Sequence, residues 1–370
     1  MSMTFQQLAI DPVWISRLKE MKITEPTPVQ EAAIPVLAAG RDALIRSGTG
    51  TGKTLAYLLP MLQRLDPSLA HLQGLVLAPT RELGAQIFQV VQELTEGTDI
   101  RCQMLIGGAA IGRQIERLKK QHPHLVVGTP GRILELLKLK KLSLHYVRLI
   151  VLDEADHMLE LGAKQEIEDI LRSTLRDRQL AFLSATMPAS VRQLAGQWMR
   201  DPEELELDVT AANLRHFYVV TEERKRIDTL RRLIVNLNPA AAIVFTNEVD
   251  RIGEIVAKLQ YGGIDIEALY SEAGKEERTK VMRDFRDGRL RLLLATDVAA
   301  RGLDIPEITH VFHFDLAIDG DHYLHRSGRA GRMGRPGTVI SLCTWREESI
   351  IRKLSKASGI PIEQRVLYGG

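Results

Sequence analysis

Cysteine is scarce in this chain. Its 370 residues include only two cysteines, Cys102 and Cys343, which lie far apart and without the spacing of metal ligands. Disulfide-rich domains need several cysteines, and structural zinc sites use them in closely spaced pairs. The composition therefore argues against both classes of cross-linked protein, and it fits a reducing cytoplasm.

A strong net charge and long apolar runs are also missing. The 49 lysine and arginine residues nearly balance the 47 aspartate and glutamate residues, which leaves a formal net charge of +2. Any basic surface for a nucleic acid must therefore be local. No apolar run reaches the length of a membrane span, and residues 1–14 contain no apolar signal segment. We therefore expect a cytoplasmic protein without a membrane partner.

The sequence does contain a recurring pattern, in which a short apolar run ends in small or polar residues and a helical segment follows. Short apolar runs that alternate with helices are typical of buried parallel strands in an α/β protein. Ligands of open parallel sheets bind at the carboxyl ends of the strands, where these polar residues would lie. The pattern occurs at residues 42–50, 74–80, 124–130, 149–156 and 180–186, and again at 241–247, 290–297, 310–315 and 338–343.

These occurrences form two clusters, and a polar stretch at residues 201–216 separates them. Two domains are the natural expectation for a chain of this length. We therefore predict one α/β domain at residues 1–207, a linker at 208–212 and a second α/β domain at 213–370. Each domain should have a mostly parallel sheet flanked by helices.

The segment "SGTGTGKT" lies between an apolar run and a helical pattern, which is the context of a phosphate-binding loop. Backbone N–H groups and the start of the helix bind the phosphates in such a loop. Lys53 should reach the β- and γ-phosphates, and Thr54 should place its hydroxyl on Mg²⁺. Ser47 replaces the usual first glycine, so a flexible loop of small residues is the alternative. The predicted nucleotide-binding residues are Ser47, Gly48, Thr49, Gly50, Thr51, Gly52, Lys53 and Thr54.

The segment "LIVLDEAD", residues 149–156, places carboxylates at the end of an apolar run. Asp153 is the candidate to hold Mg²⁺ through water, and Glu154 is the candidate base for the attacking water. The alternative is an acidic helix start. The apolar run before the carboxylates and the phosphate-binding loop upstream favour the catalytic interpretation.

The segment "HRSGRAGRMG", residues 325–334, has arginines at intervals of three among glycines. In a helix, Arg326, Arg329 and Arg332 would share one face, and guanidinium groups bind phosphate oxygens well. Arg329 and Arg332 are therefore predicted to stabilise the charge of the transferring phosphoryl group as arginine fingers. A solvated basic loop is the alternative.

Together these motifs resemble those of the DEAD-box RNA helicases, which have two RecA-like domains in tandem. The resemblance covers nearly the whole chain, and the motifs follow one another in the family's order. The further matching segments are "EPTPVQ" (25–30), "PTREL" (79–83), Gly107–Gly108, "TPGR" (129–132), "SAT" (184–186), "VFTN" (244–247) and "ATDVAARGLDI" (295–305).

The resemblance implies roles at the matching positions. Gln30 should read the adenine edge, Phe5 stands at the family's upstream aromatic position, and Asp304 should approach the ribose. Arg329 and Arg332 should be the arginine fingers. The residues expected to couple ATP to RNA and to domain closure are Ser184, Thr186, His325 and Arg326.

The resemblance also implies a set of RNA contacts. These residues are rich in threonine, glycine and arginine, which suits the phosphate and sugar of the RNA backbone and predicts binding that is independent of sequence. The preference for RNA over DNA comes from the resemblance. The predicted RNA-binding residues are Pro79, Thr80, Arg81, Gly108, Thr129, Pro130, Gly131, Arg132, Thr246, Asn247, Arg278 and Thr296.

The resulting hypothesis is a monomeric, minimal two-domain ATP-dependent RNA helicase of bacterial type. ATP with Mg²⁺ and RNA would close the domains, and closure would separate short duplexes locally. One alternative is an ATP-gated RNA clamp or ribonucleoprotein assembly factor with little unwinding. Another is a DNA helicase, against which the adenine-reading motif and the "DEAD" and "SAT" segments argue.

Overall fold

The computed structural model describes residues 3–48, 50–207, 213–270, 274–300, 308–331 and 335–367. The chain divides into two compact units, with the boundary between residues 208 and 209. The linker predicted at 208–212 lies outside the described residues, as do Thr49, Asp304 and Arg332 among the predicted site residues.

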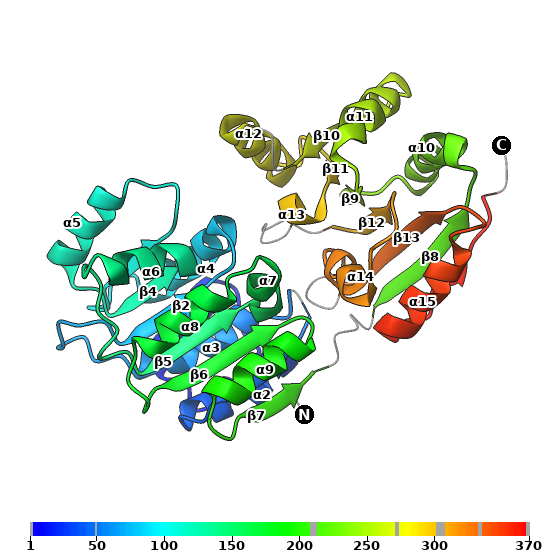
Figure 1. Cartoon of the computed structure of the whole chain (residues 1–370). Coiled ribbons are helices and arrows are strands. Elements are labelled where there is room, and N and C mark those ends of the chain that lie inside the picture. Colours follow the sequence, from blue (N-terminus) through cyan, green and yellow to red (C-terminus); the bar gives the residue numbers. More distant parts are fainter. Residues whose placement is uncertain are drawn as a thin grey trace. The chain divides into compact units, whose positions relative to one another are not determined.

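The first unit is built on a parallel sheet with the strand order β3-β4-β2-β5-β6-β1-β7 (Figure 1). Its strands are β1 (Ala43–Arg46), β2 (Gly74–Leu77), β3 (Cys102–Leu105), β4 (Leu125–Gly128), β5 (Leu149–Asp153), β6 (Gln179–Ser184) and β7 (Glu203–Glu206). Its helices are α1 (Pro12–Glu20), α2 (Pro28–Ala38), α3 (Lys53–Gln63), α4 (Arg81–Thr95), α5 (Ile111–Gln121), α6 (Pro130–Lys138), α7 (Ala155–Glu160), α8 (Lys164–Arg172) and α9 (Ala189–Trp198).

The second unit has a parallel sheet with the order β10-β11-β9-β12-β13-β8-β14. Its strands are β8 (Leu214–Val220), β9 (Ala242–Phe245), β10 (Ile266–Leu269), β11 (Leu292–Ala295), β12 (His310–His313), β13 (Gly337–Cys343) and β14 (Glu363–Gln364). Its helices are α10 (Arg226–Leu237), α11 (Ile252–Tyr261), α12 (Lys275–Arg286), α13 (Asp297–Ala300), α14 (Gly320–Ser327) and α15 (Glu348–Ser358), with short 3₁₀ turns η1 (Glu223–Lys225) and η2 (Val249–Arg251).

Both sheets have an apolar core on each face. Along β5, Leu149 and Val151 pack into one hydrophobic cluster, whereas Ile150 and Leu152 pack into another. Alternate residues of a strand point to opposite faces, so a strand covered on both faces has to be apolar throughout. The predicted fold class, with two mostly parallel sheets flanked by helices, is confirmed. In the described part of the chain, no helix has both the length and the apolar character that a membrane crossing requires.

The central strands bring separate motifs to one edge of the first sheet. β6 lies between β5 and β1, with Asp153 beside Leu183 and Arg46 beside Ser184 in the parallel register. Because parallel strands end at the same edge, the segments that follow β1, β5 and β6 meet there.

A buried histidine makes the second unit sensitive to acid. His216 on β8 bonds through Nδ1 to the hydroxyl of Tyr323 at 2.8 Å, and burial lowers its pKa from 6.5 to about 4. The folded state therefore binds fewer protons than the unfolded state between about pH 6.5 and pH 4, and stability falls as the pH drops through this window. We expect the loss to reach about 3 kcal/mol. An NMR titration of the His216 ring checks the pKa. In His216→Gln, the free energy of unfolding should depend less strongly on pH. A His216 ring that titrates near pH 6.5 would contradict this expectation.

Candidate functional site

The predicted phosphate-binding loop connects β1 to the start of α3. Gly52 has a φ of 93°, in the left-handed region, and a Cβ there would lie 2.5 Å from Nε2 of Gln30. The position therefore requires glycine. Ser47, which replaces the usual first glycine, bonds through Oγ to Oγ1 of Thr51 at 2.8 Å, and its N–H donates to the carbonyl of Ser184 at 3.0 Å. These two hydrogen bonds connect Ser47 to Thr51 within the loop and to the end of β6.

Lys53 points back into this loop from the first turn of α3. Its side chain is buried, and Nζ donates to the carbonyl oxygen of Ser47 at 2.9 Å. A buried ammonium group is unfavourable unless polar partners surround it. The loop carbonyl supplies one partner, and a phosphate bound at the start of α3 would supply a stronger one.

Asp153, at the end of β5, is held in a fixed orientation. Its Oδ2 accepts a hydrogen bond from the hydroxyl of Tyr57 at 3.0 Å, and its Oδ1 accepts one from the N–H of Glu154 at 3.0 Å. The side chain is almost completely buried, and this burial raises the pKa of Asp153 to about 6, although the charge of Lys53 acts in the opposite direction. Burial and the neighbouring Asp153 carboxylate raise the pKa of Tyr57 well above 10, so the phenol keeps the proton that it donates.

Glu154 has a strained backbone. Its φ is 54° and its ψ is 53°, in the left-handed region, which residues other than glycine rarely adopt. The position precedes α7, and the Glu154 carboxylate lies 3.3 Å from Nδ1 of His157. Strain of this kind occurs where the surrounding structure imposes it, often at active sites. The left-handed residue lies between the end of β5 and the start of α7.

The third carboxylate of this segment connects it to β6. Oδ2 of Asp156 accepts hydrogen bonds from the N–H of Thr186 at 3.0 Å and from its hydroxyl at 2.7 Å. The N–H of Asp156 in turn donates to Oγ of Ser184 at 3.2 Å. The structure therefore joins the predicted coupling residues Ser184 and Thr186 to the segment that carries the predicted catalytic carboxylates.

Gln30 joins α2 to the phosphate-binding loop. Its Oε1 accepts a hydrogen bond from the N–H of Thr27 at 3.0 Å, and its Nε2 donates to the carbonyl of Gly52 at 3.0 Å. A glutamine amide has a second N–H and a second lone pair, so the side chain keeps the capacity to bind an adenine edge. Phe5 packs into the hydrophobic core of the first unit. The adenine-reading role of Gln30 and the nucleotide contact of Phe5 stay predictions.

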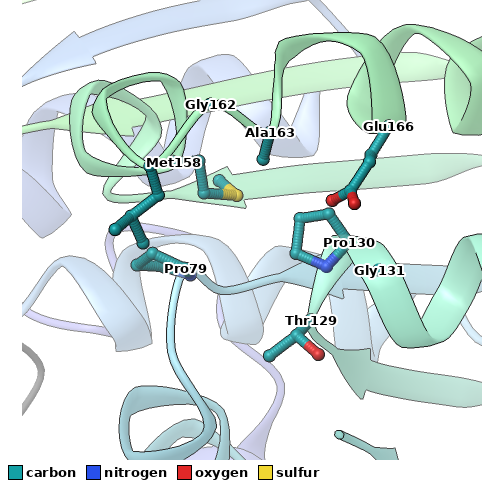
Figure 2. A pocket seen from close by; sticks show the side chains of 9 residues that line it. Pro79, Thr129, Pro130, Gly131, Met158, Gly162, Ala163 and Glu166 are labelled. Carbon is teal, nitrogen blue, oxygen red and sulfur yellow. The ribbon is translucent and has the colours of Figure 1, made fainter.

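Four of the predicted RNA-binding residues lie around one pocket in the first unit. It has a volume of about 180 Å³, and Figure 2 shows it between the start of α6 and the segment that joins α7 to α8. Thr129, Pro130 and Gly131 form the turn that opens α6, where N–H groups at a helix start favour an anion. The other lining residues are Pro79, Met158, Leu161, Gly162, Ala163 and Glu166.

Other predicted RNA-binding residues of this unit serve the fold as well. The hydroxyl of Thr80 accepts a hydrogen bond from the N–H of Leu83 and caps α4. Gly108 has a φ of 75°, and a Cβ there would lie 2.1 Å from Nη1 of Arg81, so this glycine makes room for the guanidinium. Arg132 donates to Oε1 of Gln114 at 2.8 Å and is largely buried. Sequence spacing alone did not show these internal contacts.

In the second unit, Asp315 organises the end of β9. Its Oδ2 accepts hydrogen bonds from the hydroxyl of Thr246 at 2.7 Å and from the N–H of Asn247 at 2.9 Å. The buried guanidinium of Arg226 donates to Oδ1 of the same carboxylate at 3.2 Å. Thr246 and Asn247, both predicted to contact RNA, are therefore held by an ion pair that the sequence motifs did not indicate.

The arginine segment departs from the single helical face expected of it. α14 ends at Ser327, followed by Gly328, and Gly331 has a φ of 68°. Arg326 therefore lies in the last turn of the helix and Arg329 lies beyond it, because the glycines end the helix. The expectation that the arginines share one helical face was wrong for Arg329.

Arg326 is buried within the second unit. Its guanidinium donates to both carboxylate oxygens of Asp297, at 2.7 and 2.6 Å, to the carbonyl of Asp315 at 2.8 Å and to Oδ1 of Asn247. Arg326 thus joins the segments that follow β9, β11 and β12. Its role in bridging the domains stays a prediction.

The remaining predicted residues of this unit include three buried side chains. His325 and Arg329 are buried, and Thr296 is buried with a hydroxyl that has no hydrogen-bond partner among the described residues. Arg278 lies in the first turn of α12. Their roles in coupling, catalysis and RNA binding stay predictions.

The sequence motifs did not identify five residues of these sites, namely Tyr57, Asp156, His157, Asp315 and Arg226. A signal existed for Tyr57, which follows Lys53 by four positions and therefore faces the same side of α3. Asp156 belongs to the quoted acidic segment. Asp315 and Arg226 are 89 positions apart, and no local pattern joins them.

Family models match both units. Residues 27–194 match the DEAD/DEAH box helicase model, and residues 225–334 match the helicase conserved C-terminal domain. The chain is 45% identical to the DEAD-box ATP-dependent RNA helicase CshC of Bacillus cereus, over 94% of this chain and 89% of that protein. It is 44% identical to the probable ATP-dependent RNA helicase YfmL of Bacillus subtilis, over 94% of this chain and 92% of the relative.

The fold is also similar to solved structures. S. cerevisiae Dbp5 bound to RNA and ADP BeF3 superposes with a TM-score of 0.88 and 32% identity, over 98% of this chain and 95% of that chain. A DEAD box protein from the hyperthermophile Methanococcus jannaschii has a TM-score of 0.62 and 30% identity, over 99% of this chain and 100% of that chain.

Proposed function

The chain belongs to the DEAD/DEAH box helicase family, as its motifs predicted, and from this membership we propose how its residues couple ATP hydrolysis to the local separation of short RNA duplexes. The chain is an ATP-dependent RNA helicase and therefore an RNA-dependent ATPase. The observation that carries the proposal is the hydrogen-bonded connection between the catalytic segment and the "SAT" segment through Asp156.

The phosphates of ATP bind at the start of α3. Lys53 exchanges its contact with the Ser47 carbonyl for the β- and γ-phosphates, because a charge-assisted bond to phosphate is the stronger of the two. Thr54 and Asp153 would hold the magnesium ion, Asp153 largely through water. The donor set fits this ion, since a hydroxyl and a buried carboxylate are the oxygen ligands that Mg²⁺ accepts beside phosphates. When bound there, the ion would neutralise charge on the β- and γ-phosphates.

Such a site need not contain a cluster of protein ligands. Within the described ranges no group of three or more histidine, cysteine, aspartate or glutamate side chains is arranged to hold a metal ion. That finding is compatible with an ion whose other ligands are water and substrate phosphate, the usual arrangement for Mg²⁺.

Glu154 acts as the base for the attacking water. Its carboxylate lies next in the chain after Asp153 and beside His157, on a backbone whose left-handed conformation fixes its direction. A base of this kind needs a fixed position within hydrogen-bonding reach of the water that it activates.

The RNA-binding pocket is connected to this centre through α7. The pocket at the start of α6 is lined in part by Met158 of α7, and α7 begins directly after Glu154. Asp156 in turn is bonded to Ser184 and Thr186. ATP and RNA together favour a closed state in which Arg329 and Arg332 reach the phosphates, and hydrolysis permits reopening.

The RNA contacts are to the backbone and are independent of sequence. Helix starts, threonine hydroxyls and arginines bind phosphate and sugar without reading base edges. We propose that the protein acts in the cytoplasm, because its low cysteine content fits a reducing compartment. We also propose that it acts as a monomer, because one chain carries all of the motifs.

The test of this function is ATP hydrolysis with and without RNA. We expect single-stranded RNA to stimulate the wild-type ATPase strongly and DNA of the same sequence to do so weakly. Lys53→Ala should nearly abolish ATP binding and turnover, because it removes the ammonium at the β- and γ-phosphates. The exposed Lys353→Ala is the matched control. Equal stimulation by RNA and DNA, or ATP binding that survives in Lys53→Ala, would contradict the assignment.

A further inference from the structure

Tyr57 lies where the helix of the phosphate-binding loop meets the end of β5. It is completely buried on α3, and its hydroxyl donates to Oδ2 of Asp153 at 3.0 Å. The phenol therefore directly contacts Asp153, one of the two residues assigned to the magnesium ion.

We propose that Tyr57 is a positioning residue that sets the direction of the Asp153 carboxylate, so that this group presents lone pairs to the magnesium ion of bound ATP or ADP. The inference rests on the proposed function, which assigns that ion to Thr54 and Asp153.

The direction of this hydrogen bond follows from the number of protons on each group. A phenol has one proton, and Tyr57 donates it to the Asp153 carboxylate, which has none to offer in return.

Hydrogen bonds fix both oxygens of the Asp153 carboxylate. Oδ2 of Asp153 is fixed by Tyr57 and Oδ1 by the N–H of Glu154, so the plane of the group cannot rotate without breaking a hydrogen bond. Each oxygen retains a further lone pair for the water molecules of the ion. Hydrogen bonds to ligating side chains raise metal affinity in this manner, and their loss typically lowers it by about 10- to 100-fold.

A hydroxyl with a purely structural role would stabilise the fold without changing the affinity for the ion. Thr95 provides the comparison within the same unit. It is buried at the end of α4, and its hydroxyl donates to the carbonyl of Val91 at 2.8 Å. Thr95→Val and Tyr57→Phe each remove one buried hydroxyl and keep the shape of the side chain.

The experiment is a titration with Mn²⁺ of the full chain saturated with ADP, followed by electron paramagnetic resonance. Wild type and Thr95→Val should bind Mn²⁺ equally, and Tyr57→Phe should bind it about 10-fold or more weakly. In EDTA, the affinity for ADP should be the same in all three proteins. In ATPase assays, Tyr57→Phe should need more Mg²⁺ for half-maximal rate and regain most of its turnover when Mg²⁺ saturates.

Thermal midpoints show whether the variants fold. An unchanged Mn²⁺ affinity in folded Tyr57→Phe would overturn the inference, and so would an equal loss in Thr95→Val. Failure of the proposed function would look different, because wild-type protein would then show no ADP-dependent binding of Mn²⁺ at all.

Discussion

Glu154→Gln is expected to bind ATP and RNA like the wild type and to lose turnover by about 10²- to 10⁴-fold, the usual contribution of a general base. Glutamine has the size of glutamate but its amide does not accept a proton from water. Glutamate and glutamine both carry a Cβ, so the left-handed backbone conformation costs about the same for either residue. The variant should therefore accumulate as a stable complex with ATP and RNA.

Single-turnover hydrolysis at saturating RNA measures the chemical step, and equilibrium binding of a labelled RNA with ATP measures the trapped complex. Glu116→Gln, an exposed position on α5, is the matched control and should behave like the wild type. If Glu154→Gln hydrolyses ATP at the normal rate, the base is another group. His157 would then be the next residue to test, because its ring lies 3.3 Å from the Glu154 carboxylate.

The parts of the site that sequence predicted are those that local chemistry determines. A phosphate-binding loop needs glycines for its backbone and a lysine at a fixed offset, so the segment "SGTGTGKT" can be recognised from sequence alone. The apolar runs predicted the strands because a strand buried on both faces has no polar positions. The order of the sheet then placed the ends of β1, β5 and β6 together.

The parts that sequence did not predict depend on pairs of residues far apart in the chain. Tyr57 and Asp153 are 96 positions apart, and Thr246 and Asp315 are 69 apart. Nothing in either local segment indicates its partner. Ser47 was a departure from the expected glycine, and only the structure shows its hydroxyl bonded to Thr51. The sequence periodicity gave a wrong prediction in one place. The spacing of three between the arginines predicted that they share one helical face, but α14 ends at Ser327, before Arg329.

That ending of the helix bears directly on Arg329. Arg329 lies beyond the end of α14, and its side chain is buried. We expect Arg329→Ala to reduce ATP hydrolysis by about 10³- to 10⁵-fold, the effect of losing an arginine finger. Nucleotide affinity should change much less, because the interaction is formed in the transition state. Arg329→Lys should not restore the rate, since an ammonium group lacks the planar fork of donors.

The competing interpretation, a basic patch for RNA, predicts a different pattern. Its loss would weaken RNA binding without nucleotide and reduce the salt dependence of that binding. Single-turnover hydrolysis at saturating RNA, together with RNA affinity at several salt concentrations, separates the two. Arg352→Ala, an exposed position on α15, is the matched control for a lost charge in the same unit. A variant at Arg329 that loses RNA affinity but hydrolyses ATP at the wild-type rate would make this residue part of an RNA-binding surface, and the transition-state charge would then need another cation.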